Sequence, residues 1–249
     1  MLDPKTLLDP DPFRRPPHLR LFAEAWSLAV RHPAPPLAGA LPNGNGRTVL
    51  VVPAFLTGDI CTQGLRAFLQ SCGFRPFGWG LGVNWGPTPR ILAGLERRLD
   101  ELAADGPVAL VGVSLGGILA RNLAYDRPGS ISHVVTVASP FRLPAATTIG
   151  PLVRLCAHSY SPDVNLPRLR LPLPVPSTMI CARDDGIVDP DSCWTGQDGG
   201  RVVHVNGPHL TACRNPDTLR AIVAALAGAT AHQDGRTPGA GRTLGAATV

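Results

Sequence analysis

Short apolar runs alternate with amphipathic segments along most of the chain. The apolar runs are rich in Val, Ile and Leu, as buried strands are. The segments between them carry apolar residues at helical spacing: in 91–104, leucines line one side and charged residues the other. This alternation predicts an α/β fold, a mostly parallel sheet with helices on both faces. Six strands are expected, at 47–52, 74–79, 108–113, 131–138, 177–183 and 201–206.

The helices expected between these strands follow from the same periodicity. Each one separates two apolar runs, so that consecutive strands are joined by a crossover helix. One long stretch, 139–175, breaks this rhythm because it carries many prolines and only one short helical candidate. The expected helices are 59–71, 91–104, a helix that begins after Ser114, 149–157, a turn at 190–194, and 215–227.

The chain divides into an N-terminal part, one domain and a tail. Residues 1–46 form a Pro-rich arm and a helix candidate at 18–31, whose apolar stripe includes Leu19, Phe22 and Trp26. We expect this helix to pack on the domain at 47–227, and a helix lying on a membrane surface is the alternative. Residues 228–249 are predicted to be a flexible tail.

Composition narrows the classes of function. A length of 249 residues with 44% hydrophobic and 16% charged residues suits one large domain. The net charge of +5 comes from scattered arginines, since Lys5 is the only lysine, and without a basic run nucleic-acid binding has little support. The start lacks the features of a secretory signal and no 18-residue apolar stretch follows, so a cytoplasmic location is expected.

The six cysteines are spread along the chain without a Cys-x-x-Cys motif. This spacing predicts neither a zinc site nor a disulfide framework, and no metal or cofactor is expected. Buried free thiols are the simplest interpretation. If any pair forms a disulfide, Cys193 and Cys213 are the candidates.

The segment 108–120 carries the main candidate for chemistry. Gly112-Val113-Ser114-Leu115-Gly116 fits Gly-x-Ser-x-Gly, the nucleophile elbow, in which a sharp turn from strand to helix exposes a serine oxygen. Side chains at either glycine would collide where the backbone doubles back. A serine hydroxyl also needs an imidazole to take its proton and a carboxylate to orient that imidazole.

An acid and a histidine follow later strands in the order that this chemistry needs. The strand 177–183 leads to Asp184 and Asp185, and the strand 201–206 leads to His209. In a parallel sheet, the segments that follow the strands' carboxyl ends meet at one edge. The joint placement therefore predicts a Ser-His-Asp triad, with Asp184 and then Asp189 as alternatives for the acid.

With these motifs, the region 47–227 resembles the α/β-hydrolase superfamily, and within it the bacterial lipases and esterases. The resemblance is carried by 112–116, by Asp-Gly-Ile-Val at 185–188 and by Gly-Pro-His-Leu at 207–210, with similar segments at 52–59 and 78–84. It implies Ser114 as nucleophile, Asp185 as acid and His209 as base.

The resemblance also implies an oxyanion hole made of two backbone N–H groups. One is expected from Leu115, at the start of the helix, and the other from Phe55, in the loop after the first strand. This loop departs from the common His-Gly pattern, because Ala54-Phe55 stands there. Leu56 is therefore the alternative for the second donor.

The insertion 141–175 is expected to arch over Ser114 as a small cap with an apolar face. An apolar cap favours apolar esters, so the predicted function is a serine esterase or lipase that acts on short to medium acyl esters through an acyl-enzyme. The expected partner is a small-molecule or lipid ester, with peripheral contact to a lipid surface as a further expectation. An acyltransferase, amidase or thioesterase with the same triad, or a non-catalytic binding protein of this fold, is the alternative.

Overall fold

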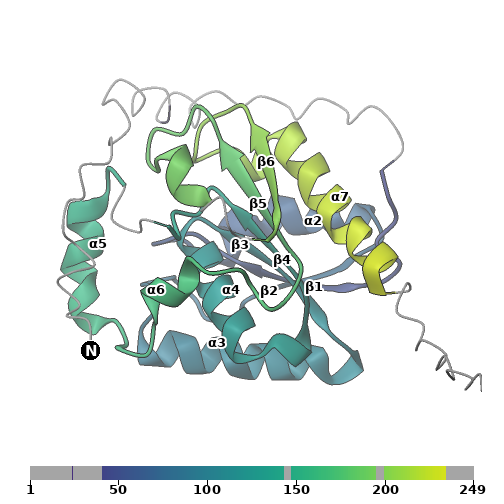
Figure 1. Cartoon of the computed structure of the whole chain (residues 1–249), viewed down its shortest axis with the longest axis horizontal. Helices are drawn as coiled ribbons and strands as arrows, with labels where there is room; N and C mark the ends of the chain where they lie inside the picture. The colour runs from purple at the N-terminus through teal and green to yellow at the C-terminus, as the bar shows by residue number, and fades with distance from the viewer. Residues whose placement is uncertain (1–23, 25–40, 143–146, 195–198, 234–249) are drawn as a thin grey trace, which may run out of the picture.

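The computed structural model describes residue 24 and residues 41–142, 147–194 and 199–233. In these residues a central sheet is covered by helices on both faces (Figure 1). All six predicted strands are present, each within a residue or two of the predicted bounds. They are β1 (Thr48–Val52), β2 (Arg75–Gly78), β3 (Val108–Val113), β4 (Ile131–Val137), β5 (Ser177–Ala182) and β6 (Arg201–Val205).

The sheet is parallel throughout, in the order β2-β1-β3-β4-β5-β6. β1 and β3 are apolar along almost their whole length, and nearly every residue of β1, β3 and β5 is buried, as is usual for strands covered on both faces. The strand order reverses beside β1, where the chain moves from β2 across to β3. Ligands bind at the carboxyl edge near such a reversal in open α/β sheets.

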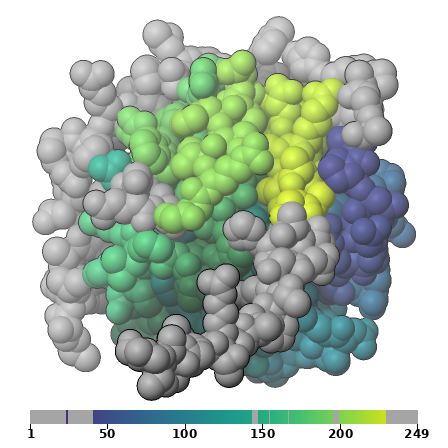
Figure 2. Space-filling view, turned by 45° about the vertical axis from the view of Figure 1, so that its right-hand side comes forward, coloured from purple at the N-terminus to yellow at the C-terminus, as the bar shows by residue number. Residues whose placement is uncertain are grey.

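Two apolar cores hold the helices against the sheet. One joins α2 (Gln63–Ser71) and α7 (Pro216–Gln233) to one face, and the other joins α3 (Pro89–Leu102) and α4 (Leu115–Asp126) to the opposite face. Figure 2 shows α7 beside the segment that begins at residue 41. There the Arg47 guanidinium donates to the Leu226 carbonyl, which fixes α7 to the start of β1.

The insertion between β4 and β5 contains more helix than its sequence predicts. α5 (Gly150–Cys156) agrees with the prediction, and η5 (Ala157–Ser159) continues it. α6 (Leu166–Leu169) was not expected, because a single turn that contains Pro167 is too short to show periodicity. Asn165 caps α6 by accepting from the Arg168 amide at 3.0 Å.

The other short elements complete the crossovers. α7 extends to Gln233, beyond the predicted end at 227, because its alanines continue the helix through Gly228. The remaining single-turn helices are η2 (Asp59–Thr62), η3 (Ala103–Asp105), η4 (Pro128–Ser130), η6 (Pro190–Cys193) and η7 (Ala212–Arg214).

Two predictions at the ends of the chain lie outside the described residues. The arm and the helix at 18–31 do so except for Glu24, and the tail does so from residue 234. All six cysteines are free thiols. A hydrogen bond between the side chains of Cys193 and Cys181, together with burial, raises the pKa of the Cys193 thiol. The candidate pair Cys193 and Cys213 is therefore not joined.

Candidate active site

The turn between β3 and α4 brings Ser114 to the carboxyl edge of the sheet. Ser114 has φ 51° and ψ −120°, and α4 starts at the next residue. A Cβ added to Gly112 would lie 2.4 Å from the Gly116 carbonyl oxygen, and one added to Gly116 would lie 2.3 Å from the Val52 carbonyl oxygen. Only glycine fits at both positions, as the motif predicts.

A buried carboxylate and imidazole face each other at the same edge. Asp185 Oδ2 lies 2.6 Å from His209 Nδ1, and both side chains are buried. Asp185 Oδ1 accepts from the amides of Ile187 (2.8 Å) and Val188 (2.7 Å), which orients the carboxyl group. The hydrogen bond at Nδ1 leaves Nε2 as the nitrogen that can accept a hydroxyl proton.

The two alternative acids make other contacts. Asp184 is exposed, and its Oδ2 accepts from the Gly207 amide at 3.0 Å. Asp189 caps η6 by accepting from the Asp191 amide at 3.0 Å. Of the three carboxylates, only Asp185 is hydrogen-bonded to His209.

Hydrogen bonds hold the loop after β1, and they engage the amides of Leu56 and Thr57. The Leu56 N–H donates to the Asn84 carbonyl at 2.8 Å, so it does not face an incoming substrate. Asn84 itself is buried and its Nδ2 donates to the Pro53 carbonyl at 2.7 Å. These contacts favour Phe55 over Leu56 as the second oxyanion donor. The amide of Leu115 begins α4, where a helix has no internal acceptor for its first N–H groups.

Strained backbone conformations with positive φ occur at the carboxyl edge of the sheet. In the described part of the chain four non-glycine residues have positive φ, and three of them follow the carboxyl ends of sheet strands. These three are Leu56 (57°), Ser114 (51°) and Ala138 (48°). Such conformations cost free energy and persist where surrounding contacts enforce them, which is common at functional sites.

A cavity of about 610 Å³ lies beside the loop that holds Asn84. Its walls come from the segment after β2, the start of α3 and the α5–η5 segment. Apolar side chains dominate them, and no carboxylate is among the lining residues. They are Leu81, Val83, Trp85, Thr88, Arg90, Ile91, Leu155, Cys156, His158 and Ser159.

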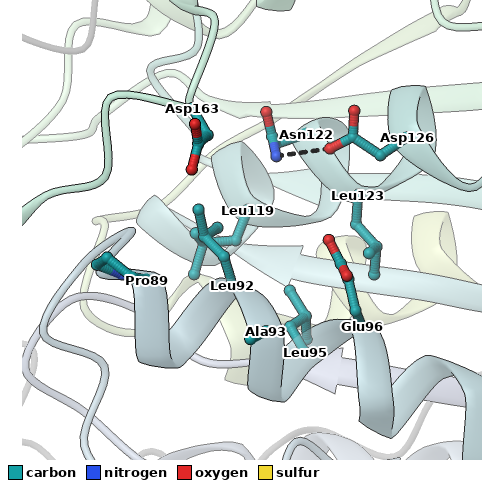
Figure 3. A pocket seen from close by; sticks show the side chains of 10 residues that line it. All are labelled: Pro89, Leu92, Ala93, Leu95, Glu96, Leu119, Asn122, Leu123, Asp126 and Asp163. Carbon is teal, nitrogen blue, oxygen red and sulfur yellow. Dashed lines mark hydrogen bonds between the residues drawn. The ribbon is translucent and has the colours of Figure 1, made fainter.

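A second cavity of about 210 Å³ lies between α3 and α4 (Figure 3). Its lining includes three carboxylates, Glu96, Asp126 and Asp163. Asp126 is already held by Asn122 and by Arg168, whose guanidinium lies 2.8 Å away. None of the proposed triad or oxyanion residues is among the residues that line either cavity.

The cap insertion is hydrogen-bonded to the loop that carries Asp185. Thr147 pairs with Val188 in an antiparallel bridge, and the Thr148 amide donates to the Ile187 carbonyl at 2.9 Å. Its apolar residues divide between two environments: Leu169 is fully buried, whereas Leu152 and Leu155 are exposed.

Sequence reasoning missed two residues at this edge. Asn84 lies in the segment 78–84, which enters above only through the resemblance, although an Asn in a loop rich in Gly and Pro is typical of a turn held by side-chain hydrogen bonds. Glu24 is buried against the loops that carry Asp185 and His209. A lone carboxylate between Ala23 and Ala25 on an apolar helix candidate was the available signal.

The described residues contain neither a metal-ligand cluster nor a membrane-spanning helix. Among the described residues, no three His, Cys, Asp or Glu side chains are grouped so that they would hold a metal ion. No helix in the described ranges has the length and apolarity that crossing a membrane requires.

No family model matches the sequence, and no curated protein matches it. Solved structures are similar in shape. A structure from work on the metagenome-derived lipolytic enzymes LipS and LipT has a TM-score of 0.57 at 14% identity, covering 81% of this chain and 100% of that chain. Est1E from Butyrivibrio proteoclasticus with bound ferulic acid has a TM-score of 0.54 at 11% sequence identity, and the match covers 79% of this chain and 94% of that chain. The thioesterase domain of the curacin biosynthetic pathway has a TM-score of 0.53 at 16% sequence identity, and the match covers 74% of this chain and 93% of that chain. The chain has the α/β-hydrolase fold.

Proposed function

We propose that this chain is a serine carboxylic-ester hydrolase that works through an acyl-enzyme. Ser114 is the nucleophile, His209 the general base and Asp185 the residue that orients His209. The observation that carries the proposal is the buried 2.6 Å hydrogen bond between Asp185 and His209, at the sheet edge where the Ser114 turn lies. The esterase and lipolytic structures that share the fold support the same reaction class.

The proposed chemistry follows from these positions. His209 Nε2 takes the proton of Ser114 as its oxygen attacks the ester carbonyl, and the imidazolium returns this proton to the departing alcohol. A water molecule then attacks the acyl-serine by the same route. The oxyanion formed in each step is stabilised by the amides of Leu115 and Phe55. Loss of one such donor typically lowers kcat by about 10²–10³-fold.

The substrate proposed is an apolar ester with a short to medium acyl chain. Support comes from the 610 Å³ cavity, which has mainly apolar walls and borders the loop holding Asn84. Asn84 in turn fixes the loop of Phe55, so the cavity and the second oxyanion donor share one support. The cap segment contributes Leu155 to the cavity wall, and we propose that it covers the bound acyl chain.

A fluorophosphonate probe with intact-mass detection tests the nucleophile. We expect one adduct on the unmodified protein and none on Ser114→Ala. Absence of an adduct on the unmodified protein, or its persistence on Ser114→Ala, contradicts the proposal. Asp126→Asn, on the α3–α4 cavity, is the control that should label normally.

Nitrophenyl esters of graded chain length then define the acyl group, and a matching acyl thioester series tests the second candidate. The likeness in shape to a thioesterase domain favours this second series. Faster turnover of thioesters than of oxygen esters with the same acyl chain would assign the site to thioester hydrolysis.

A further inference from the structure

Glu24 is a buried carboxylate that contacts two separate loops. It is 2% exposed, and it is the one residue among the first 40 that the structure describes. Its Oε1 accepts from the amides of Gly186 at 2.8 Å and His209 at 2.6 Å, and its Oε2 accepts from the Leu210 amide at 2.8 Å. Its partners are 162 to 186 residues away in sequence.

These three amides belong to the backbone that carries the acid and the base. Gly186 directly follows Asp185, and the second donor is the amide of His209 itself. Hydrogen bonds from amides to an ionised carboxylate are shorter and stronger than those between neutral groups. One side chain therefore sets the separation of the two loops at the point where Asp185 Oδ2 meets His209 Nδ1.

The loops are also joined without Glu24. β5 and β6 pair along their length, the Arg183 amide donates to the Val205 carbonyl at 2.8 Å, and Asp184 accepts from the Gly207 amide. These contacts hold the strand ends together, but none of them reaches the amide of His209. What Glu24 adds is the orientation of the His209 backbone relative to Asp185.

We propose that Glu24 is a positioning residue for the Asp185–His209 pair, supplied by the N-terminal segment. This inference rests on the proposed hydrolase function for its kinetic consequences. Glu24 does not exchange a proton with substrate. It acts through the geometry of His209, so its loss affects the chemical step and leaves ester binding unchanged.

Three variants of Glu24 separate shape from charge. Glu24→Ala removes all three acceptor contacts and leaves buried amides unpaired. Glu24→Gln keeps the shape and one oxygen, but its NH2 group faces at least one amide donor. Glu24→Asp keeps the charge on a shorter side chain. A displacement of catalytic groups by about 1 Å can cost roughly 100-fold in rate, which is the fall in kcat expected for Glu24→Ala.

The test measures kcat and KM for a nitrophenyl ester, the rate of fluorophosphonate labelling of Ser114, and the low-field NMR resonance of the His209 Nδ1 proton. We expect Glu24→Ala to lower kcat and the labelling rate, leave KM unchanged and weaken the resonance. Glu24→Gln should recover part of each. Asp184→Asn removes the other carboxylate contact between the loops and should keep kcat close to the unmodified value.

A control for stability alone is Leu99→Ala, which removes a fully buried side chain from α3. If Glu24→Ala lowers kcat no more than Leu99→Ala does, the inference is overturned. If Glu24→Ala does not fold, the Gln and Asp variants decide by the same readouts. If the unmodified protein is not labelled, the proposed function fails and the resonance alone decides. Full strength of the resonance in Glu24→Ala overturns the positioning role, and weakening in Glu24→Ala with partial recovery in Glu24→Gln supports it.

Discussion

At the scale of single residues, Asp184 and Asp185 show that neighbouring identical side chains have different environments. Asp185 is buried and bonded to His209 and to two amides, whereas Asp184 is exposed and bonded to one amide. We predict that Asp185→Asn lowers kcat by about 10⁴-fold, because the wrong imidazole tautomer is then favoured. Asp184→Asn should change kcat little.

Steady-state kinetics on a soluble nitrophenyl ester measure both variants. Circular dichroism confirms that each is folded before the rates are compared. A large loss of kcat in Asp184→Asn together with a small one in Asp185→Asn would exchange the assignments of the two residues.

His133 on β4 is a second residue whose burial has a measurable consequence. Its Nε2 lies 3.1 Å from Thr178 Oγ1, and burial, assisted by the charge of Arg47, lowers the pKa of His133 from 6.5 to about 4. The folded protein therefore binds this proton less readily than the unfolded chain. The contribution to stability is complete above pH 6.5 and is lost as the pH falls toward 4, by about 2 kcal/mol between pH 7 and 5.

Urea unfolding at a series of pH values between 7 and 5 checks this prediction. His133→Gln removes the titrating group, so the free energy of unfolding of that variant should fall less over the same range. His204, which is exposed on β6, provides the matched control as His204→Gln. Equal pH dependence in His133→Gln and the unmodified protein would contradict the assignment.

At the scale of elements, Arg121 fixes the cap segment to α4. It is fully buried, its Nε and Nη2 donate to the Leu169 carbonyl at 3.1 and 2.8 Å, and Nη2 donates to the Leu171 carbonyl at 2.9 Å. The guanidinium also lies 3.9 Å from the ring centre of Phe141. Without Arg121, the Leu169 carbonyl at the end of α6 would lose this donor, whereas the Leu171 carbonyl just beyond α6 would keep the Tyr125 hydroxyl.

We predict that Arg121→Met lowers the free energy of unfolding by roughly 3 kcal/mol, since a buried charged donor to the Leu169 carbonyl is lost. Hydrogen exchange of 166–171 should rise more than that of the sheet. Arg98→Met is the control: it removes a surface pair with Glu101 at 2.8 Å, and such pairs contribute less than about 1 kcal/mol. Equal losses in the two variants would rule out an anchoring role for Arg121.

The elements that sequence could predict are those determined by local pattern. The clearest strands are continuous apolar runs such as 108–113, and these indicate buried strands in any context. α6 has one turn and no periodicity, so it was missed. Asp185 and Asp184 could not be separated with certainty because burial depends on the packing of β5, β6 and the N-terminal segment. The contacts of Glu24 and Asn84 are tertiary, and no local pattern specifies them.

At the scale of the whole molecule, the carboxyl edge of the sheet has residues with strained backbone, the buried carboxylates of Glu24 and Asp185, and exposed apolar side chains. Large apolar side chains remain exposed on the segments after β1, β2 and β6 and on α5. They are Leu56, Ile60, Val83, Trp85, Leu152, Leu155 and Leu210. Apolar surface gathered near a site marks contact with an apolar partner. A dispersed ester phase is an apolar partner that fits the proposed function.

The last prediction concerns this apolar edge. Ile60 is 77% exposed on η2 and does not line the 610 Å³ cavity. We predict that the rate of hydrolysis of a medium-chain ester rises when the ester concentration passes its solubility limit. Ile60→Ser should weaken adsorption of the protein to the dispersed ester roughly tenfold, because apolar surface is lost. Its kcat/KM on a soluble short ester should stay unchanged. Leu171→Ser alters an exposed leucine on the segment that leads to the opposite, amino end of β5, so it should behave as the unmodified protein does. Equal loss in both variants would show that the carboxyl edge has no special part in binding the ester phase.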